Sequence, residues 1–260
     1  MIERAAAGAL LAALIAGLGW WARALTGSGA AVAVAMGTLA VAAGWRLAIL
    51  LILFFLASSA LSRAGAARKA TRMRGIVEKG GARDARQVAA NGGAFAVAAA
   101  ASLGGAGDAW LVAAIGALAA STADTWGTEI GALARGAPRL VTTGRRVPPG
   151  TSGAVSVPGL AATLAGAGFI AATAVLLGWA ASVGAAVFAG GLAGAMADSL
   201  LGATAQERRR CASCGTDTEQ RTHVCGQGTR RIGGLAWLEN DAVNLISSAV
   251  GAAVAATLSS

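Results

Sequence analysis

Long runs of small and apolar residues, separated by short polar segments, extend along almost the whole chain. A membrane-crossing helix needs about 17–25 such residues, and the runs do not alternate with the period of two that membrane β-strands require. The pattern predicts an all-α bundle of about eight transmembrane helices that forms a single integral membrane domain over 1–260. The expected spans lie near 5–22, 29–43, 45–61, 88–104, 108–133, 153–177, 180–204 and 233–258.

Composition supports a membrane protein. Of 260 residues, 56% are hydrophobic and 13% are charged, whereas about a quarter of the residues in soluble domains are charged. The 38 glycines indicate closely packed helices, because small residues let helix backbones approach each other in lipid. The first run resembles a secretory signal, but Glu3 and the WWAR motif at 20–23 favour a retained helix.

Positive charge is concentrated in three segments between the predicted spans. Eighteen of the 21 lysine and arginine residues fall in 62–87, 134–152 and 205–232. Because basic loops gather on the cytoplasmic side of a bilayer, we expect these loops to face the cytoplasm and both termini to lie outside. Some of these residues are also candidates for binding phosphate or anionic headgroups.

Carboxylates inside or at the rim of predicted spans are the first candidates for chemistry, because a buried charge is costly in a bilayer. They are Asp124, Glu129, Asp198 and Asp241. The expected orientation of the spans brings all four to the side of the basic loops. Each one on its own has a simpler explanation, a helix end that lies at the membrane surface.

Helical spacing groups these acids with other oxygen donors. Ser121, Asp124 and Thr128 share one helix face, and Asn240, Asp241 and Asn244 lie together near the start of the last span. Carboxylate and amide oxygens suit Mg²⁺, which also keeps water and substrate phosphates as ligands, and suit zinc or copper poorly. We predict that Asp124, Asp198 and Asp241 bind Mg²⁺, with Glu129, Asn240 and Asn244 in support.

A glycine-rich basic segment leads into the fourth predicted span and carries Lys79, Arg83, Gln87 and Asn91. The last three follow every fourth residue, so one helix face presents a guanidinium and two amides. Phosphate binding is one interpretation, because charge and a helix start both favour anions. An ordinary interfacial helix start is the other. Further candidates for phosphate contacts precede other spans, at Arg146, Thr151, Ser152 and Arg231.

All three cysteines and the single histidine lie within 15 residues of the loop 205–232, as Cys211, Cys214, His223 and Cys225. This spacing is typical of a structural zinc site with three cysteine ligands and one histidine ligand. A redox-active cysteine pair and free thiols are the alternatives, because a cytoplasmic loop does not keep a stable disulfide.

Five motifs occur in an order that resembles the integral-membrane phytyl-phosphate kinase family of tocopherol synthesis. They are KGGARDARQVAANGG, STADTWGTEIG, RRVPPGTSGAVSVPG, ADSLLGATAQ and GGLAWLENDAVN, with the Cys/His loop before the last. The resemblance covers roughly 75–258. A more distant similarity links the order of elements to CDP-diacylglycerol synthase and to phytol and dolichol kinases. The synthases' Lys-Thr-x-x-Gly element lacks its lysine here, where 149–153 is PGTSG, which favours the kinases.

The resemblance implies a Mg²⁺-dependent enzyme that transfers a phosphoryl group from CTP to an isoprenyl monophosphate such as phytyl phosphate. Asp124, Asp198, Asp241 and Arg83 would then be the catalytic residues. An acceptor that is already an anion needs no general base, so catalysis reduces to positioning and charge neutralisation. The expected partners are CTP, an isoprenyl phosphate and the membrane, with no nucleic acid, and the oligomeric state stays open.

Two other functions remain open. A cytidylyltransferase acting on a lipid phosphate would release pyrophosphate instead of CDP. A transporter would use its intramembrane acids to bind cations, and an inverted repeat would support it. The similar Asp-containing spans 108–133 and 180–204 have the same orientation, which indicates at most a parallel duplication.

Overall fold

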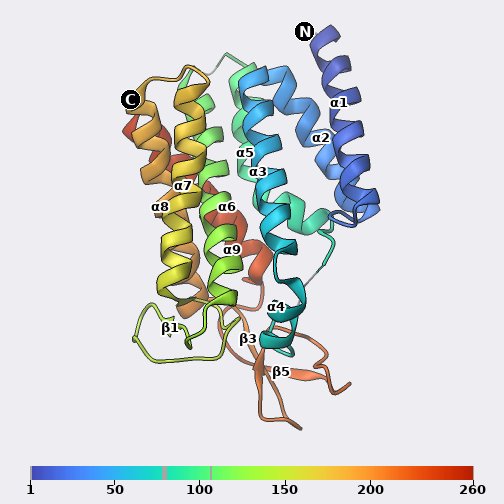
Figure 1. The fold of residues 1–260 in the computed structure, drawn as a ribbon, viewed down its shortest axis with the longest axis vertical. Coiled ribbons are helices and arrows are strands. Elements are labelled where there is room, and N and C mark those ends of the chain that lie inside the picture. The colour runs from blue at the N-terminus through green and yellow to red at the C-terminus, as the bar shows by residue number, and fades with distance from the viewer. Residues whose placement is uncertain (1, 78–80, 106, 260) are drawn as a thin grey trace.

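The computed structural model describes residues 2–77, 81–105 and 107–259, and it is mostly helical. Long helices lie side by side in an elongated bundle (Figure 1). Along the described ranges the helices are α1 (Ile2–Trp21), α2 (Gly27–Ala43), α3 (Trp45–Arg63), α4 (Ala66–Arg72), α5 (Ala85–Leu103), α6 (Ala109–Leu133), α7 (Val157–Leu176), α8 (Ala181–Thr204) and α9 (Asn240–Leu258).

Each of the eight predicted spans contains one long helix. Two of the predicted boundaries were wrong, because residues 153–156 and 233–239 are not helical and α7 and α9 start after them. Within the described residues, α3, α7, α8 and α9 are long and apolar enough to cross a membrane, and Ala6–Trp21 and α2 are shorter apolar helices. The helical bundle is therefore confirmed, and the number of eight spans stays a prediction.

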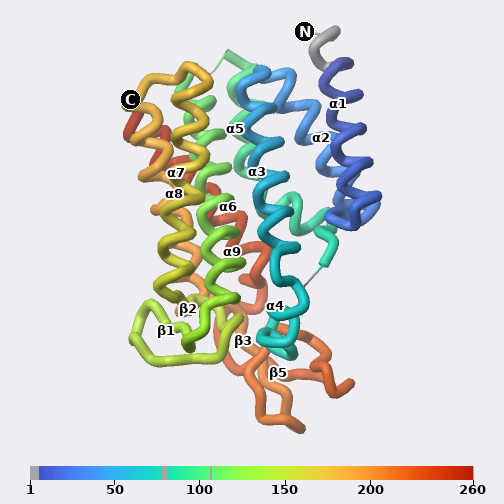
Figure 2. Tube along the Cα trace, in the orientation of Figure 1, coloured from blue at the N-terminus to red at the C-terminus, as the bar shows by residue number. Residues whose placement is uncertain are grey.

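Both termini lie at one end of the bundle, and the basic loops lie together at the other (Figures 1 and 2). These loops contain short strands, so the all-α prediction was wrong there. β1 (Arg139–Leu140) and β2 (Ala154–Val155) form an antiparallel pair. β3 (Arg208–Cys211) lies between β4 (Asp217–Thr218) and β5 (Thr229–Gly233) in an antiparallel sheet. Strand pairing satisfies backbone groups that the polar loops cannot satisfy as helices.

The centre of the bundle is α6, which packs against α5, α7, α8 and α9 and is buried along 112–123. Glycines allow this packing. A Cβ atom at Gly251 of α9 would lie 2.5 Å from Ala120 Cβ and 2.9 and 3.0 Å from the carbonyl oxygens of Gly116 and Gly190. Three helices therefore meet where a methyl group has no room, which explains the high glycine content.

The start of α5 is fastened to the turn between α1 and α2. Arg83 donates its backbone N–H to Ala24 O at 2.9 Å, and its carbonyl accepts from Thr26 N at 3.0 Å. Gly29 permits this contact, because a Cβ there would lie 2.2 Å from the Arg83 oxygen. This turn lies partway along α3 rather than at the end of the bundle (Figure 1). The contact therefore holds the Arg83 backbone inside the bundle.

Candidate functional site

Asp124 of α6 and Asp198 of α8 face each other inside the bundle. Their carboxyl groups lie within hydrogen-bonding reach, and Asp198 also reaches the Ser247 hydroxyl of α9. Asp198 Oδ2 is buried and receives no well-aligned hydrogen bond from the residues that the structure describes. Two ionised carboxylates this close repel each other, so the pair requires a proton or a cation. These residues fit a bound Mg²⁺, which accepts two carboxylates and completes its shell with phosphate and water.

A third carboxylate approaches this pair from the polar loop. Glu219 lies close enough to Asp198 to act on it electrostatically. It accepts hydrogen bonds from the Ser152 hydroxyl and, at 2.9 Å, from Gln206 Nε2, and its backbone N–H binds Ile76 O. Sequence analysis missed Glu219, because no helical period relates the Cys/His loop to the spans. Ser152, one of the predicted phosphate contacts, is brought to the acidic cluster through it.

Asp241 lies in the first turn of α9, six residues before Ser247. At 1.5 Å per residue it is about 9 Å further toward the loops along the helix axis. Asn244 lies between them, and its carbonyl accepts a hydrogen bond from Ser247 at 3.0 Å. The neighbouring Asn240 helps to line a small polar pocket at the ends of α8 and α9 with Gln206, Glu207, Glu219, Arg221 and Glu239.

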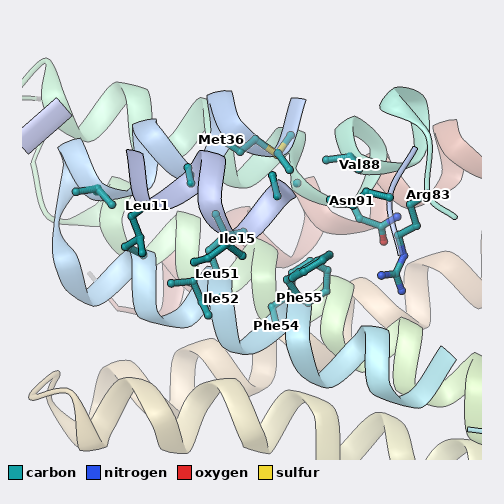
Figure 3. Close-up of a pocket in the computed structure, with 18 of the residues that line it drawn as sticks. Leu11, Ile15, Met36, Leu51, Ile52, Phe54, Phe55, Arg83, Val88 and Asn91 are labelled. Carbon is teal, nitrogen blue, oxygen red and sulfur yellow. The ribbon is translucent and has the colours of Figure 1, made fainter. Parts of the chain in front are cut away.

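An apolar pocket opens among α1, α2, α3 and α5, with an empty volume of about 890 Å³, its mouth included. Side chains such as Leu11, Ile15 and Ile52 line its apolar length (Figure 3). Arg83 and Asn91 lie together at one end of it (Figure 3). Thr125, the residue after Asp124, also lines the pocket, so α6 contributes both to the pocket wall and to the carboxylate pair.

The side chains of the predicted phosphate-binding face of α5 already form hydrogen bonds within the protein. Gln87 closes a capping box with Asp84, because Gln87 Oε1 accepts the Asp84 N–H at 3.2 Å. Asn91 Nδ2 donates to Gln87 O at 3.0 Å. The Arg83 guanidinium donates to the Ser59 and Ser62 hydroxyls, each at 3.1 Å. Burial lowers the Arg83 pKa from its ordinary value, but arginine keeps its charge in proteins.

Glu129 does not join the aspartates. Its Oε2 forms an ion pair with Lys69 of α4, and its Oε1 accepts a hydrogen bond from the Ser62 hydroxyl at 2.5 Å. Lys69 also donates to the carbonyl oxygens of Leu61 and Ser62, each at 2.8 Å. Its side chain therefore links α4 to α6, and a supporting role for Glu129 in binding Mg²⁺ or nucleotide stays a prediction.

The remaining predicted site residues are spread more widely. Ser121 is buried and donates to Asn91 O at 2.7 Å, whereas Thr128 on the same face is exposed. The Thr151 hydroxyl binds Pro148 O at 2.8 Å inside its own loop. The two arginines Arg146 and Arg231 are exposed. Lys79 lies outside the described residues.

The four soft ligands of the loop 205–232 are gathered in one place. Cys211, Cys214, His223 and Cys225 place their ligand atoms within 4.8 Å of one another. All three cysteines are reduced. The Cys214 backbone lowers the pKa of Cys211, whereas the Cys225 sulfur raises the pKa of Cys214 to about 11. A thiol with this pKa is protonated near neutral pH.

The chain was compared with known families and proteins. The family model described as "Integral membrane protein DUF92" matches residues 10–252 of this chain. The protein PGR of Arabidopsis thaliana is 32% identical over 267 aligned residues, which cover 92% of this chain and 90% of PGR. An uncharacterized membrane protein of Methanocaldococcus jannaschii is 35% identical over 163 residues, 62% of this chain and 65% of that protein. No solved structure matches.

Proposed function

This chain belongs to the integral membrane protein family DUF92, and we propose that it is a Mg²⁺-dependent kinase that transfers the terminal phosphoryl group of CTP to an isoprenyl monophosphate. One observation carries the proposal. An apolar pocket has Arg83 and Asn91 at one end (Figure 3), and its lining includes Thr125 of α6, which directly follows Asp124 of the carboxylate pair. A ligand with an apolar tail and an anionic head matches both parts of this arrangement.

The pocket supports a lipid acceptor. Its walls are almost entirely apolar, and its charged side chain within the described residues is Arg83, at the polar end. A flexible isoprenyl chain gains free energy from apolar contact along the walls, and its phosphate meets the guanidinium in a charge-assisted hydrogen bond. The Ser59 and Ser62 hydroxyls hold that guanidinium in position.

The carboxylate pair supports metal-assisted phosphoryl transfer. Asp124 and Asp198 would hold Mg²⁺, with Ser247 beside Asp198 and with Asp241 about one and two-thirds turns before Ser247 on α9. A bound magnesium ion would neutralise the negative charge of the triphosphate. Arg83 and Asn91 would orient the acceptor phosphate for in-line attack.

The reaction needs no general base from this chain. An oxygen of the isoprenyl monophosphate, already ionised near neutral pH, forms a bond to the terminal phosphorus of CTP. The bond between that phosphorus and the bridging oxygen breaks, and CDP leaves with the electron pair. The chain's single histidine lies in the cysteine cluster, which agrees with a reaction of this kind.

We propose that all eight long helices cross the membrane, with the basic loops in the cytoplasm. α5 and α6 carry polar residues such as Asn91 and Asp124 within their apolar sequence, which agrees with functional rather than lipid-facing positions for those side chains. An even number of spans agrees with termini at one end of the bundle (Figure 1), and the basic residues at the other end agree with the distribution of positive charge in membrane proteins.

The test uses full-length protein in detergent or lipid nanodiscs with CTP, Mg²⁺ and phytyl phosphate. We expect CDP and phytyl diphosphate in equal amounts. Pyrophosphate release would identify a cytidylyltransferase, and no turnover across several isoprenyl phosphates would refute the proposal. Asp124→Asn should lower kcat at least 100-fold, because it removes a metal ligand from the transition state.

The matched control for Asp124→Asn is Asp108→Asn. Asp108 precedes the same helix at its other end, is exposed and makes no side-chain cap. We expect its kcat to match that of the unmodified protein. Equal losses in both variants would indicate general damage to α6 rather than a metal site at Asp124.

A further inference from the structure

Two tight turns bring four soft ligand atoms together in the small sheet at the loop end of the bundle. Cys211 is the last residue of β3 and Cys214 lies in the connection from β3 to β4, whereas His223 and Cys225 lie in the connection from β4 to β5. Each pair is followed directly by a glycine, Gly215 at φ +66° and Gly226 at φ +83°. A glycine adopts this left-handed conformation without steric cost, so both turns fold back sharply after their second ligand.

The distances between the ligand atoms agree with a tetrahedral metal site. Cys211 Sγ and Cys225 Sγ are 3.6 Å apart, and His223 Nδ1 and Cys225 Sγ are 3.2 Å apart. Zn–S bonds of about 2.3 Å at tetrahedral angles separate two sulfur atoms by about 3.8 Å. A disulfide requires about 2.05 Å, so the measured separation fits two ligands of one ion and not a bond between them.

The sheet has almost no apolar core of its own. Among residues 208–233 the buried side chains are Cys211, Thr218 and His223, and two of these three are ligand candidates. Such a small element needs a metal or another cross-link to stay folded, because it buries too little apolar surface. The donor set is three sulfurs and one imidazole nitrogen, which selects zinc over the oxygen-preferring magnesium.

We infer that Cys211, Cys214, His223 through Nδ1, and Cys225 bind one structural Zn²⁺ ion that holds the sheet β4-β3-β5 against the helix ends. The ligand set leaves no open position, so the ion has a structural role rather than a catalytic one. This inference is independent of the proposed kinase activity, since it concerns the metal content and folding of the loop.

Contacts of the sheet connect the proposed zinc site to the acidic cluster. Thr218 Oγ1 and Glu219 N both donate to Ile76 O, and Gln220 Nε2 donates to Val77 O. These three consecutive residues come shortly after the β3–β4 connection, which the zinc ion would close. The zinc ion therefore keeps Glu219 beside Asp198 by holding the sheet that carries it.

The His223 side chain packs against Gly75, which lies outside the Cys/His loop. A Cβ atom at Gly75 would lie 2.9 Å from His223 Nε2, and Gly75 has φ +78°. The backbone at this position packs directly against the imidazole edge opposite the ligand nitrogen. This close packing restricts the orientation of the imidazole ring.

The test measures metal in the full-length protein, purified in detergent without chelators after expression with added zinc. We expect one zinc per chain by inductively coupled plasma mass spectrometry. Cys211→Ser and Cys225→Ser should each lose at least 80% of it. Ser213→Ala is the matched control, because Ser213 is exposed within the same turn and offers no soft ligand, and it should keep the full amount.

A second measurement covers variants that fail to fold. The unmodified protein, stripped by a chelator and refilled with Co²⁺, should show the thiolate-to-cobalt charge-transfer band and the visible bands of a tetrahedral site. Absence of these bands, a stoichiometry well below one, iron in place of zinc, or full zinc retention in both cysteine variants would each overturn the inference.

Discussion

The ion pair between Lys69 and Glu129 allows a specific prediction about stability, because the two charged groups differ in burial and in the partners that remain when the other is removed. Lys69 is 4% exposed and Glu129 is 21% exposed. Glu129→Gln leaves a buried ammonium group with two carbonyl partners and with the Arg83 guanidinium near the same site. Lys69→Met leaves a carboxylate that keeps the Ser62 hydroxyl and the charge of Arg83.

The magnitudes follow from this difference. Removing one partner of a buried ion pair costs about 3–5 kcal/mol when the other charge stays uncompensated. We expect Glu129→Gln to lower the free energy of unfolding by about 3 kcal/mol, the lower end of that range, since water reaches part of the site. Lys69→Met should cost about 1–3 kcal/mol, as for a polar group that loses one partner. The double variant should cost less than the sum.

The assay is reversible unfolding in mixed detergent micelles, followed by the fluorescence of the seven tryptophans. The control is Asp217→Asn, which breaks an ion pair in which the side chains of Arg210 and Asp217 are 45% and 61% exposed, and it should leave the stability nearly unchanged, because water screens an exposed pair. Strict additivity of the two single variants would refute the coupling. A Glu129→Gln variant with unchanged stability but impaired CTP binding would contradict the structural role and indicate that Glu129 contacts the nucleotide.

Two further predictions concern packing and the apolar pocket. Gly251→Ala should lower the free energy of unfolding by about 1–3 kcal/mol, because its methyl group would overpack the meeting point of α6, α8 and α9. The control Gly17→Ala should be neutral or stabilising, since an added Cβ there meets no atom within 4 Å. Equal melting temperatures of the Gly251→Ala and Gly17→Ala variants would contradict this account. Ile52→Trp should fill part of the pocket and raise the KM for phytyl phosphate about tenfold without changing the KM for CTP. Leu56→Trp, exposed on the same helix, should leave both constants unchanged, and an unaltered lipid KM in Ile52→Trp would exclude the pocket as the acceptor site.

Much of the fold followed from local pattern. Apolar runs of the length of a bilayer and their polar interruptions predicted the long helices to within a few residues, except at the starts of α7 and α9. Those two starts were misplaced because small apolar residues such as Ala154, Val155 and Leu235 suit a strand or a turn as well as a helix. Backbone pairing across the sheets decided between them, and such pairing is not local.

The acidic candidates show the same division. Orientation of the predicted spans was enough to bring Asp124 and Asp198 toward one end, and the structure places their carboxyl groups side by side. Glu129 looked equivalent to these aspartates in the sequence, but its side chain pairs with Lys69 instead. Lys69 belongs to the short helix α4, which no apolar run predicts. Glu219 joined the cluster through a loop fold, where the sequence carries no periodic signal.

The sequence alone determined that the chain belongs in a membrane, where its long helices lie, and that its soft ligands occupy one loop. These are consequences of composition and spacing over a few turns of helix. The tertiary structure decided which of the four candidate acids pair with each other, where an apolar pocket opens, and how the loop reaches the helix ends. Each of these depends on contacts between segments far apart in the chain, where the energy of a residue is set by its partner and not by its neighbours in sequence.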